Sequence, residues 1–406
     1  MSTLMSCIGI AALILIGYLF SENKRNINVK TITFALILQI SLGAFVMFVP
    51  IGVTIIEGMS SGVNHVIEFS NAGLTFVFGD LANYKVGFVF VINVLCVVIF
   101  ISALISVLYY LKIMQFVINI IGGTLSKLLG TSKAESLSAT ANIFVGPIEA
   151  PSMVRPLVKN MTRSELFAVM TGGLASVAGG TMVGYINIGI DPKYILTACF
   201  MTAPAGLLFA KLLCPQTEPE LVKNNIEINS EDKPKSLLDA ITDGSIMGMN
   251  QVAVVTALLI SFVALIALVN GLLSGVGQLI NIDNLTLESI IGYALSPLAF
   301  LMGVPWSEAI SAASIIGQKI AINEFVAYIN FLEVADTLSD KTQVIIIFSL
   351  CGFANIGSLA MVVGGIGAMC PDKRELISQI GPRVLLASIL ANLMSGTIAG
   401  GLISLM

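Results

Sequence analysis

Apolar residues run along this chain in blocks of about 20, the length at which an α-helix crosses the hydrocarbon of a bilayer. The blocks cover residues 3–20, 31–56, 87–110, 164–187, 193–213, 251–274, 343–368 and 380–405. Glycines, prolines and polar clusters separate them. A transmembrane β-barrel would instead alternate apolar and polar residues with a period of two. The pattern predicts eight transmembrane helices in an all-α integral membrane protein.

Two further segments, 134–160 and 305–331, mix apolar stretches with small and polar residues, and each carries an internal glutamate, Glu149 and Glu324 respectively. A carboxylate inside a straight span is costly. Irregular backbone at membrane depth is tolerated where it packs in protein or lines a cavity. We therefore expect two re-entrant helical hairpins.

The remaining segments are too polar to span. Residues 57–84, 111–130 and 285–302 are expected to lie at the membrane interface. The hydrophilic stretch 214–236 is expected to be an extramembrane connection that leads to a short amphipathic helix before the sixth span.

The basic residues predict the orientation, because cytoplasmic loops carry an excess of lysine and arginine. Placing the N-terminus outside puts most of the 20 lysines and arginines on the cytoplasmic side. Eight spans then leave both termini outside the cytoplasmic (inner) membrane. No basic residue precedes the first apolar block, so we expect a retained first span and not a cleaved signal peptide.

The two halves of the chain repeat. At a constant offset, Gly173 aligns with Gly352 and Ser176 aligns with Asn355. The order hairpin, span, span occurs twice, and the hairpins enter from opposite sides. This order is typical of inverted-topology repeats, in which substrate binds near the midplane where broken helices meet.

Composition narrows the function. Charged residues make up 11% of the chain, against about 25% in soluble domains, and a net charge of −4 gives no reason to expect a nucleic-acid partner. The six cysteines form no CxxC pair, and the single His65 cannot build a zinc site with them. GxSxG, HExxH and Walker A motifs are absent from the sequence. We expect no enzyme and no cofactor, while a carrier, a channel and a receptor remain open.

Several polar residues are candidates for binding. Asn355 and Ser358 lie one turn apart on the seventh span, Ser176 is the repeat counterpart of Asn355 in the first half, and Asn142 lies in the first expected hairpin. Amide and hydroxyl oxygens with freed carbonyls suit a hard cation, while neighbouring Asn and Glu suit sugar hydroxyls. The alternatives are structural: interhelical hydrogen bonds for Asn355 and Ser358, a helix cap for Asn142, and for Glu324 an ion pair with Lys319.

Four motifs in order resemble the concentrative nucleoside transporter family over nearly the whole chain. They are Gly146-x-x-Glu149-Ala150-Pro151, Gly303-Val304-Pro305-Trp306-Ser307-Glu308-Ala309, Asn323-Glu324-Phe325-Val326-Ala327-Tyr328 and Gly352-Phe353-Ala354-Asn355-x-x-Ser358. The resemblance implies a homotrimer in the membrane lipid that takes up nucleosides with a cation, Na+ being expected and H+ the alternative.

The resemblance also implies a fixed scaffold and a transport domain that moves like an elevator. Residues 1–110 would supply scaffold spans one to three, and 214–284 the loop, amphipathic helix and sixth scaffold span. Residues 111–213 would hold an interfacial helix, the first hairpin and spans four and five of the transport domain. Residues 285–406 would repeat that arrangement with the second hairpin and spans seven and eight.

Residue roles follow from the same resemblance. Glu324, Asn355 and Ser358 are expected to hydrogen-bond the ribose, and Phe353 to contact it. Pro147, Ile148 and Glu149 are expected to face the nucleobase, with Thr181 opposite. The expected Na+ ligands are Asn142, the Val145 carbonyl, Ser176 and the Val177 carbonyl.

The chain departs from the family at the hairpin tip. Its Gly146-Pro147-Ile148-Glu149 stands where the family usually has Gly-Gln-x-Glu. Because the glutamine amide that would read the base is missing, ribose recognition is expected to be intact while the base preference stays open.

Overall fold

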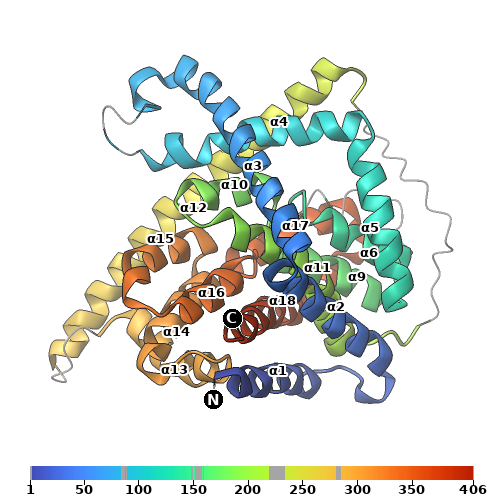
Figure 1. Cartoon of the computed structure of the whole chain (residues 1–406), viewed down its shortest axis with the longest axis vertical. Coiled ribbons are helices and arrows are strands. Elements are labelled where there is room, and N and C mark those ends of the chain that lie inside the picture. Colours follow the sequence, from blue (N-terminus) through green and yellow to red (C-terminus); the bar gives the residue numbers. More distant parts are fainter. Residues whose placement is uncertain are drawn as a thin grey trace.

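The computed structural model describes residues 2–83, 87, 89–147, 150, 158, 160–218, 234–279 and 285–405. Within these ranges every regular element is a helix (Figure 1). Six helices are long and apolar enough to cross a membrane, or seven if α13 and α14, bent by 117°, count as one span. The described part of the chain is therefore an all-helical membrane protein.

The helices follow the predicted blocks closely. The first half contains α1 (Ser2–Leu19), α2 (Val29–Phe48), α3 (Pro50–Phe78), α4 (Val97–Tyr110), α5 (Ile113–Leu129), α6 (Lys133–Ala141), α9 (Arg163–Ala175), α10 (Gly179–Asn187) and α11 (Pro192–Leu213). The second half contains α12 (Leu237–Leu279), α13 (Leu287–Leu301), α14 (Trp306–Ala321), α15 (Glu324–Val334), α16 (Asp340–Leu350), α17 (Ile356–Met369) and α18 (Arg374–Ile403).

The predicted second span, 31–56, is wrong at its C-terminal end. α2 ends at Phe48, and Pro50 is the first residue of α3, which continues to Phe78 through the predicted interfacial segment. Proline has no backbone N–H and disfavours helical geometry in the residue before it. Val49 is accordingly extended, and the chain changes direction there.

The expected short amphipathic helix before the sixth span is also wrong. α12 is one continuous helix of 43 residues that crosses the whole molecule beside α4 (Figure 1). Only 6% of the apolar stretch of α12 that could span the membrane is buried.

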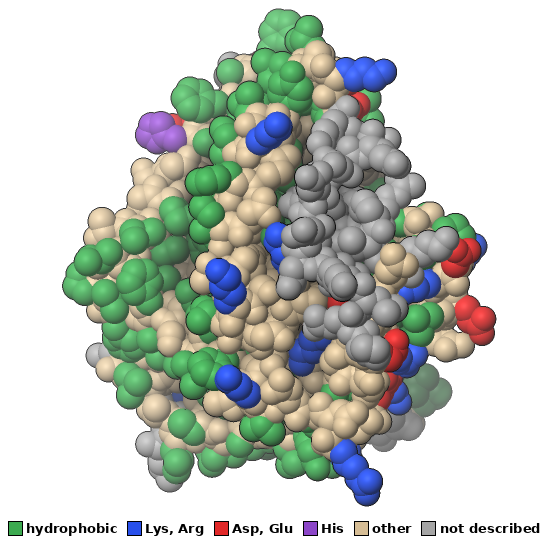
Figure 2. All heavy atoms as spheres, turned by 90° about the vertical axis from the view of Figure 1, so that its right-hand side faces the viewer, with side chains coloured by type: hydrophobic (Ala, Val, Ile, Leu, Met, Phe, Trp, Pro, Cys, Tyr) green, Lys and Arg blue, Asp and Glu red, His purple; other side chains and the backbone are tan. Residues whose placement is uncertain are grey.

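Figure 2 shows hydrophobic side chains spread over the left part of the displayed face, whereas most of the visible acidic side chains gather along its right edge. Such exposed apolar surface suits lipid or a second copy of the chain.

The blocks predicted as the fourth and seventh spans are each broken near the middle. The first break separates α9 from α10 at residues 176–178, and the second separates α16 from α17 at residues 351–355. Glycines occur beside both breaks, where they allow the chains to approach closely. The breaks leave helix ends, with their unpaired carbonyl and N–H groups, inside the protein.

The two breaks meet and bind each other. The Phe353 N–H donates to the Ser176 carbonyl at 3.1 Å. Asn392 of α18 bridges them, because its Nδ2 donates to the carbonyls of Ala175 at 2.6 Å and Cys351 at 3.2 Å. These bonds satisfy carbonyls at the C-terminal ends of two helices, which would otherwise be buried without a donor.

Lys319 of α14 adds a further contact where the two breaks meet, a place called the crossing below. Its ammonium donates to the Ser349 carbonyl at 2.7 Å and to Asn392 Oδ1 at 2.6 Å. A cation at the C-terminal end of a helix interacts favourably with the helix dipole. Lys319, in the segment predicted as the second hairpin, thus binds the second broken span directly and reaches the first through Asn392.

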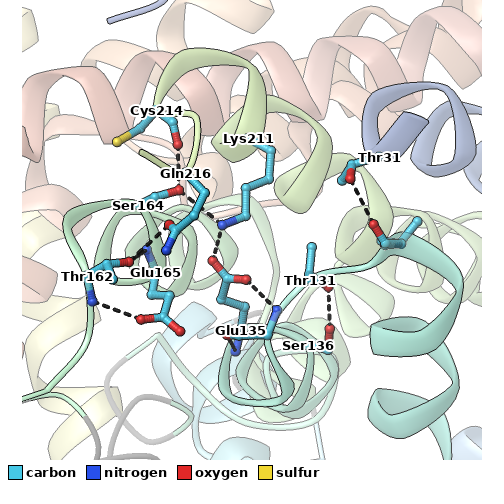
Figure 3. Close-up of polar contacts among 12 residues, drawn as sticks. Thr31, Thr131, Glu135, Ser136, Thr162, Ser164, Glu165, Lys211, Cys214 and Gln216 are labelled. Carbon is cyan, nitrogen blue, oxygen red and sulfur yellow. Dashed lines mark hydrogen bonds and ion pairs between the residues drawn. The ribbon is translucent and has the colours of Figure 1, made fainter. Parts of the chain in front are cut away.

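A polar cluster fixes the base of the first hairpin (Figure 3). Glu135 of α6 binds the ammonium of Lys211 on α11, which also reaches Ser164 Oγ of α9 at 3.0 Å. Glu135 also closes a capping box with Ser132. Since both charges are buried and paired, the contact joins three helices in one geometry.

The crossing predicts the effect of adding one methyl group. A Cβ on Gly352 would lie 2.4 Å from both the Ala175 carbonyl oxygen and Asn392 Oδ1. We expect Gly352→Ala to lower stability by about 1–3 kcal/mol, the usual cost of overpacking. Thermal unfolding in detergent measures this loss. Gly357→Ala is the matched control, since its Cβ would meet only Asn355 Oδ1 at 3.4 Å; equal melting temperatures for both variants would contradict the prediction.

Candidate substrate and ion sites

Glu324 and Asn355 form the centre of the predicted ribose site. Asn355 Nδ2 donates to Glu324 Oε2 at 3.0 Å, and both side chains are buried. Glu324 is the first residue of α15 and Asn355 is the N-cap of α17. Two helix N-termini therefore converge on one carboxylate, whose negative charge they stabilise.

Local capping explains this geometry. Asn323 Oδ1 accepts from the Val326 N–H at 3.0 Å, and Asn355 Oδ1 accepts from the Ser358 N–H at 2.7 Å. Ser358 is buried one turn into α17, next to the pair. The structure brings Glu324, Asn355 and Ser358 together as the sequence predicted. Their use in ribose binding stays a prediction.

Aromatic rings pack around the pair. The Tyr185 ring centroid lies 4.7 Å from that of Phe325 and 4.8 Å from that of Tyr328. The Tyr328 hydroxyl donates to the Ile347 carbonyl at 2.8 Å. Phe353 is 7% exposed and bonded by its backbone to the other break. Because Tyr185, Phe325 and Tyr328 are buried, the surroundings of the pair are largely apolar.

Sequence reasoning missed Gln251. Thr181 of α10, predicted to face the base, is buried and accepts a hydrogen bond from Gln251 Nε2 of α12 at 2.7 Å. An amide within an apolar helix was the available signal, since such a group requires a partner in the membrane. This bond connects the long helix α12 to the helix that follows the first break.

The proposed ion pair between Lys319 and Glu324 does not form. The Lys319 ammonium binds Ser349 and Asn392, and Glu324 accepts from Asn355. The structural alternative for Glu324, a charge held by a lysine, is therefore wrong.

The predicted ion ligands also converge. Asn142 follows α6, and its Nδ2 donates to the Ser138 carbonyl at 2.9 Å. Its Oδ1 is buried and accepts no hydrogen bond within the described part of the chain. An orphaned buried oxygen is costly unless something binds it. This oxygen fits a hard cation, which takes oxygen ligands.

The tip of the first hairpin lies against the first break. The Phe144 carbonyl accepts from the Gly179 N–H at 3.1 Å, and Pro147 lies against Gly173. Ser176 and Val177, both buried, occupy the non-helical turn between α9 and α10. Val145 follows Phe144 in the same tip. The four predicted ion-site residues thus belong to two segments in direct contact.

Part of the predicted base site is not described. Pro147 is described and half-buried, whereas Ile148 and Glu149 lie outside the described residues.

Comparison with known families covers almost the whole chain. Residues 8–81 match the model of the Na+ dependent nucleoside transporter N-terminus, and residues 194–400 match that of its C-terminus. Residues 91–191 match a model described as nucleoside recognition.

Relatives from bacteria and mammals are similar over the same length. The nucleoside permease NupC of Helicobacter pylori is 48% identical, over 100% of this chain and 99% of its own. The putative nucleoside permease NupX of Escherichia coli is 44% identical over 100% of both chains. Human solute carrier family 28 member 3 is 36% identical over 98% of this chain and 59% of its own.

Solved structures agree. The chain superposes on CNTnw in an inward-facing substrate-bound state with a TM-score of 0.95 and 47% identity, covering 100% of this chain and 99% of that chain. A double variant of CNTnw in an outward-facing state gives a TM-score of 0.96 at the same identity, covering 100% of this chain and 98% of that one. The geometry of the crossed breaks, the family models and the relatives agree, and the chain belongs to the concentrative nucleoside transporter family.

Proposed function

We propose that this protein imports nucleosides across the cytoplasmic membrane together with Na+, by an elevator movement of a transport domain within a homotrimer. The observation that carries the proposal is the buried Glu324–Asn355 pair at two helix N-termini. A carboxylate that accepts and an amide that donates match vicinal sugar hydroxyls, which need both. Free bases lack those hydroxyls and would gain little from the pair.

The proposal of sodium coupling is based on the residues at the first break. Asn142 Oδ1 accepts from no donor among the described residues, and the neighbouring predicted hairpin tip and the turn supply carbonyl oxygens. Neither Asn142 nor Ser176 titrates, so a proton has no obvious place to bind there. In our proposal Na+ uses Asn142, Ser176 and the carbonyls of Val145 and Val177.

The crossing supplies a physical route for coupling. Ser176, on the ion side, accepts directly from the N–H of Phe353, on the substrate side. An ion that orders the turn at Ser176 would order Phe353 as well. Linkage then requires that bound nucleoside raise the affinity for Na+ by the same factor.

The full architecture is proposed to comprise eight spans and two re-entrant hairpins, with both termini outside and repeats of opposite topology. Packing of α4 on α12 supports a scaffold that includes these two helices. α1 and α2 pack on α11 and α18, so their assignment to the scaffold stays a prediction. An elevator movement would break the bond from Gln251 of α12 to Thr181 of α10.

Base selectivity is proposed to differ from relatives that have a glutamine at the hairpin tip. Pro147 has neither an amide donor nor an amide acceptor in its side chain. The carbonyl oxygen and the Cβ of Pro147 lie against Gly173. Contacts to the base edge must then come from other residues or be fewer, which favours a broad range of bases.

The ribose pair generates the first functional prediction. Glu324→Gln should weaken binding of uridine and adenosine alike by about 1–3 kcal/mol, because the amide keeps only one of the two acceptor oxygens and carries no negative charge. Isothermal titration or scintillation proximity binding measures the change. Glu333→Gln, an exposed glutamate on the same helix, is the matched control. Unchanged affinity in correctly folded Glu324→Gln would remove Glu324 from the ribose site.

The hairpin tip generates the second functional prediction. Pro147→Gln restores an amide and should shift preference towards pyrimidine nucleosides by about 1 kcal/mol, the net value of one hydrogen bond. Competition of uridine and inosine for one labelled nucleoside reports the shift. The same ratio of affinities before and after the substitution would show that Pro147 does not face the base.

The ion site generates the third functional prediction. Uptake into proteoliposomes should rise with external Na+ at fixed pH, and Asn142→Ala should flatten that dependence because a ligand oxygen is lost. Asn330→Ala is the control, since that amide binds Gln318 in the second hairpin. Uptake that follows a pH gradient and ignores replacement of Na+ by choline would instead identify a proton-coupled carrier. Counterflow of labelled nucleoside separates either carrier from a channel or a receptor.

A further inference from the structure

A groove lies between α1 and α2, whose connecting turn is at the lower right in Figure 1. It has a volume of about 650 Å³ and is open on one side. That volume falls within the range of about 300–1,000 Å³ typical of small-molecule sites. The groove plays no part in the proposed nucleoside or ion sites.

The walls of the groove are apolar, and some of their side chains are exposed. Ala11 and Leu15 of α1 form one side, Val29 and Ile32 of α2 form the other, and Leu212 of α11 closes the floor. Leu15 leaves 56% of its surface exposed and Val29 leaves 70%. In water such exposure is unfavourable, whereas the acyl chain of a lipid would cover it.

One end of the groove is cationic. Lys24 and Arg25, in the short turn between α1 and α2, are the charged residues among the described ones that line it. The Lys24 ammonium lies 5.3 Å from the centroid of the Tyr18 ring, which also lines the groove. This cation–π contact keeps the ammonium at the rim.

Neither cation has an acidic partner among the residues that the structure describes. Ion pairs with Lys24 or Arg25 are absent from the described part of the chain. The nearest carboxylate in sequence, Glu22, is held by Arg163 and Arg383. The hydrogen bond from Arg163 lowers the pKa of Glu22 to about 2, so this carboxylate stays ionised and engaged with those two arginines.

We propose that this groove binds an anionic phospholipid, whose phosphate contacts Lys24 and Arg25 and whose acyl chain lies along α1 and α2 over Leu212. The groove matches the two parts of such a lipid. The cations lie where α1 ends and would contact the phosphate, and the apolar walls extend along the helices, where the acyl chain would lie. From Ala11 to Tyr18 the helical rise gives about 10 Å of wall. Basic pockets between membrane helices typically bind such headgroups.

The lipid would stabilise a structural junction. Glu22, two residues before Lys24, joins the α1–α2 turn to α9 through Arg163 and to α18 through Arg383. A headgroup on Lys24 and Arg25 fixes the same turn from the membrane side. Bound lipid therefore holds α1 and α2 against the helices that carry the first break and the crossing amide.

Native mass spectrometry of the purified full chain tests the proposal with phosphatidylglycerol and phosphatidylcholine at equal concentration. Wild type should retain at least about fivefold more phosphatidylglycerol. Lys24→Ala/Arg25→Ala should abolish that preference. Lys127→Ala/Lys235→Ala removes the same charge from exposed sites outside the groove and should keep it.

A second variant tests the acyl-chain part. Ala11→Phe fills the groove and leaves both cations in place, so it should reduce phosphatidylglycerol retention about as much as removing the charges. Retention unchanged by Ala11→Phe would mean that only a headgroup or free phosphate binds, and would overturn the proposal. No phosphatidylglycerol preference in wild type, or equal losses in the two double variants, would overturn it too. Since no readout involves nucleoside or Na+, the result is independent of the proposed transport function.

Discussion

The crossing of two broken spans is the constraint on which the rest of the molecule depends. Four helix ends meet inside the protein, and each brings backbone groups that lack intrahelical partners. The chain satisfies them with a backbone bond between Phe353 and Ser176, with the Asn392 amide and with the Lys319 ammonium. Because these bonds are shared between the halves, neither break can be positioned without the other.

Burial of charge follows from the same constraint. Glu324 and Lys319 are both buried and five residues apart, yet each binds a different set of partners. The lysine neutralises a helix C-terminus and the glutamate lies at a helix N-terminus. The dipole of the adjacent helix opposes the desolvation cost at each position.

The predicted site was largely recoverable from sequence because its members are polar residues in apolar surroundings. Glu324, Asn355 and Asn142 are conspicuous in that context, and the structure places the first two in contact. Gln251 and Asn392 are equally polar but were missed. Their partners, Thr181 and two backbone carbonyls, come from distant segments that no local pattern connects.

The sequence by itself determined the membrane class and most helix positions, because hydrophobic length and periodicity act locally along the chain. Only the tertiary structure decided where the spans break, since unwinding 176–178 or 351–355 is favourable only with a partner that satisfies the freed groups. It also decided that α12 continues unbroken through 43 residues, whereas the start of α3 at Pro50 follows from the local chemistry of proline. The physical reason is that local preference fixes a helix, whereas the cost of an unpaired buried carbonyl depends on what lies across from it.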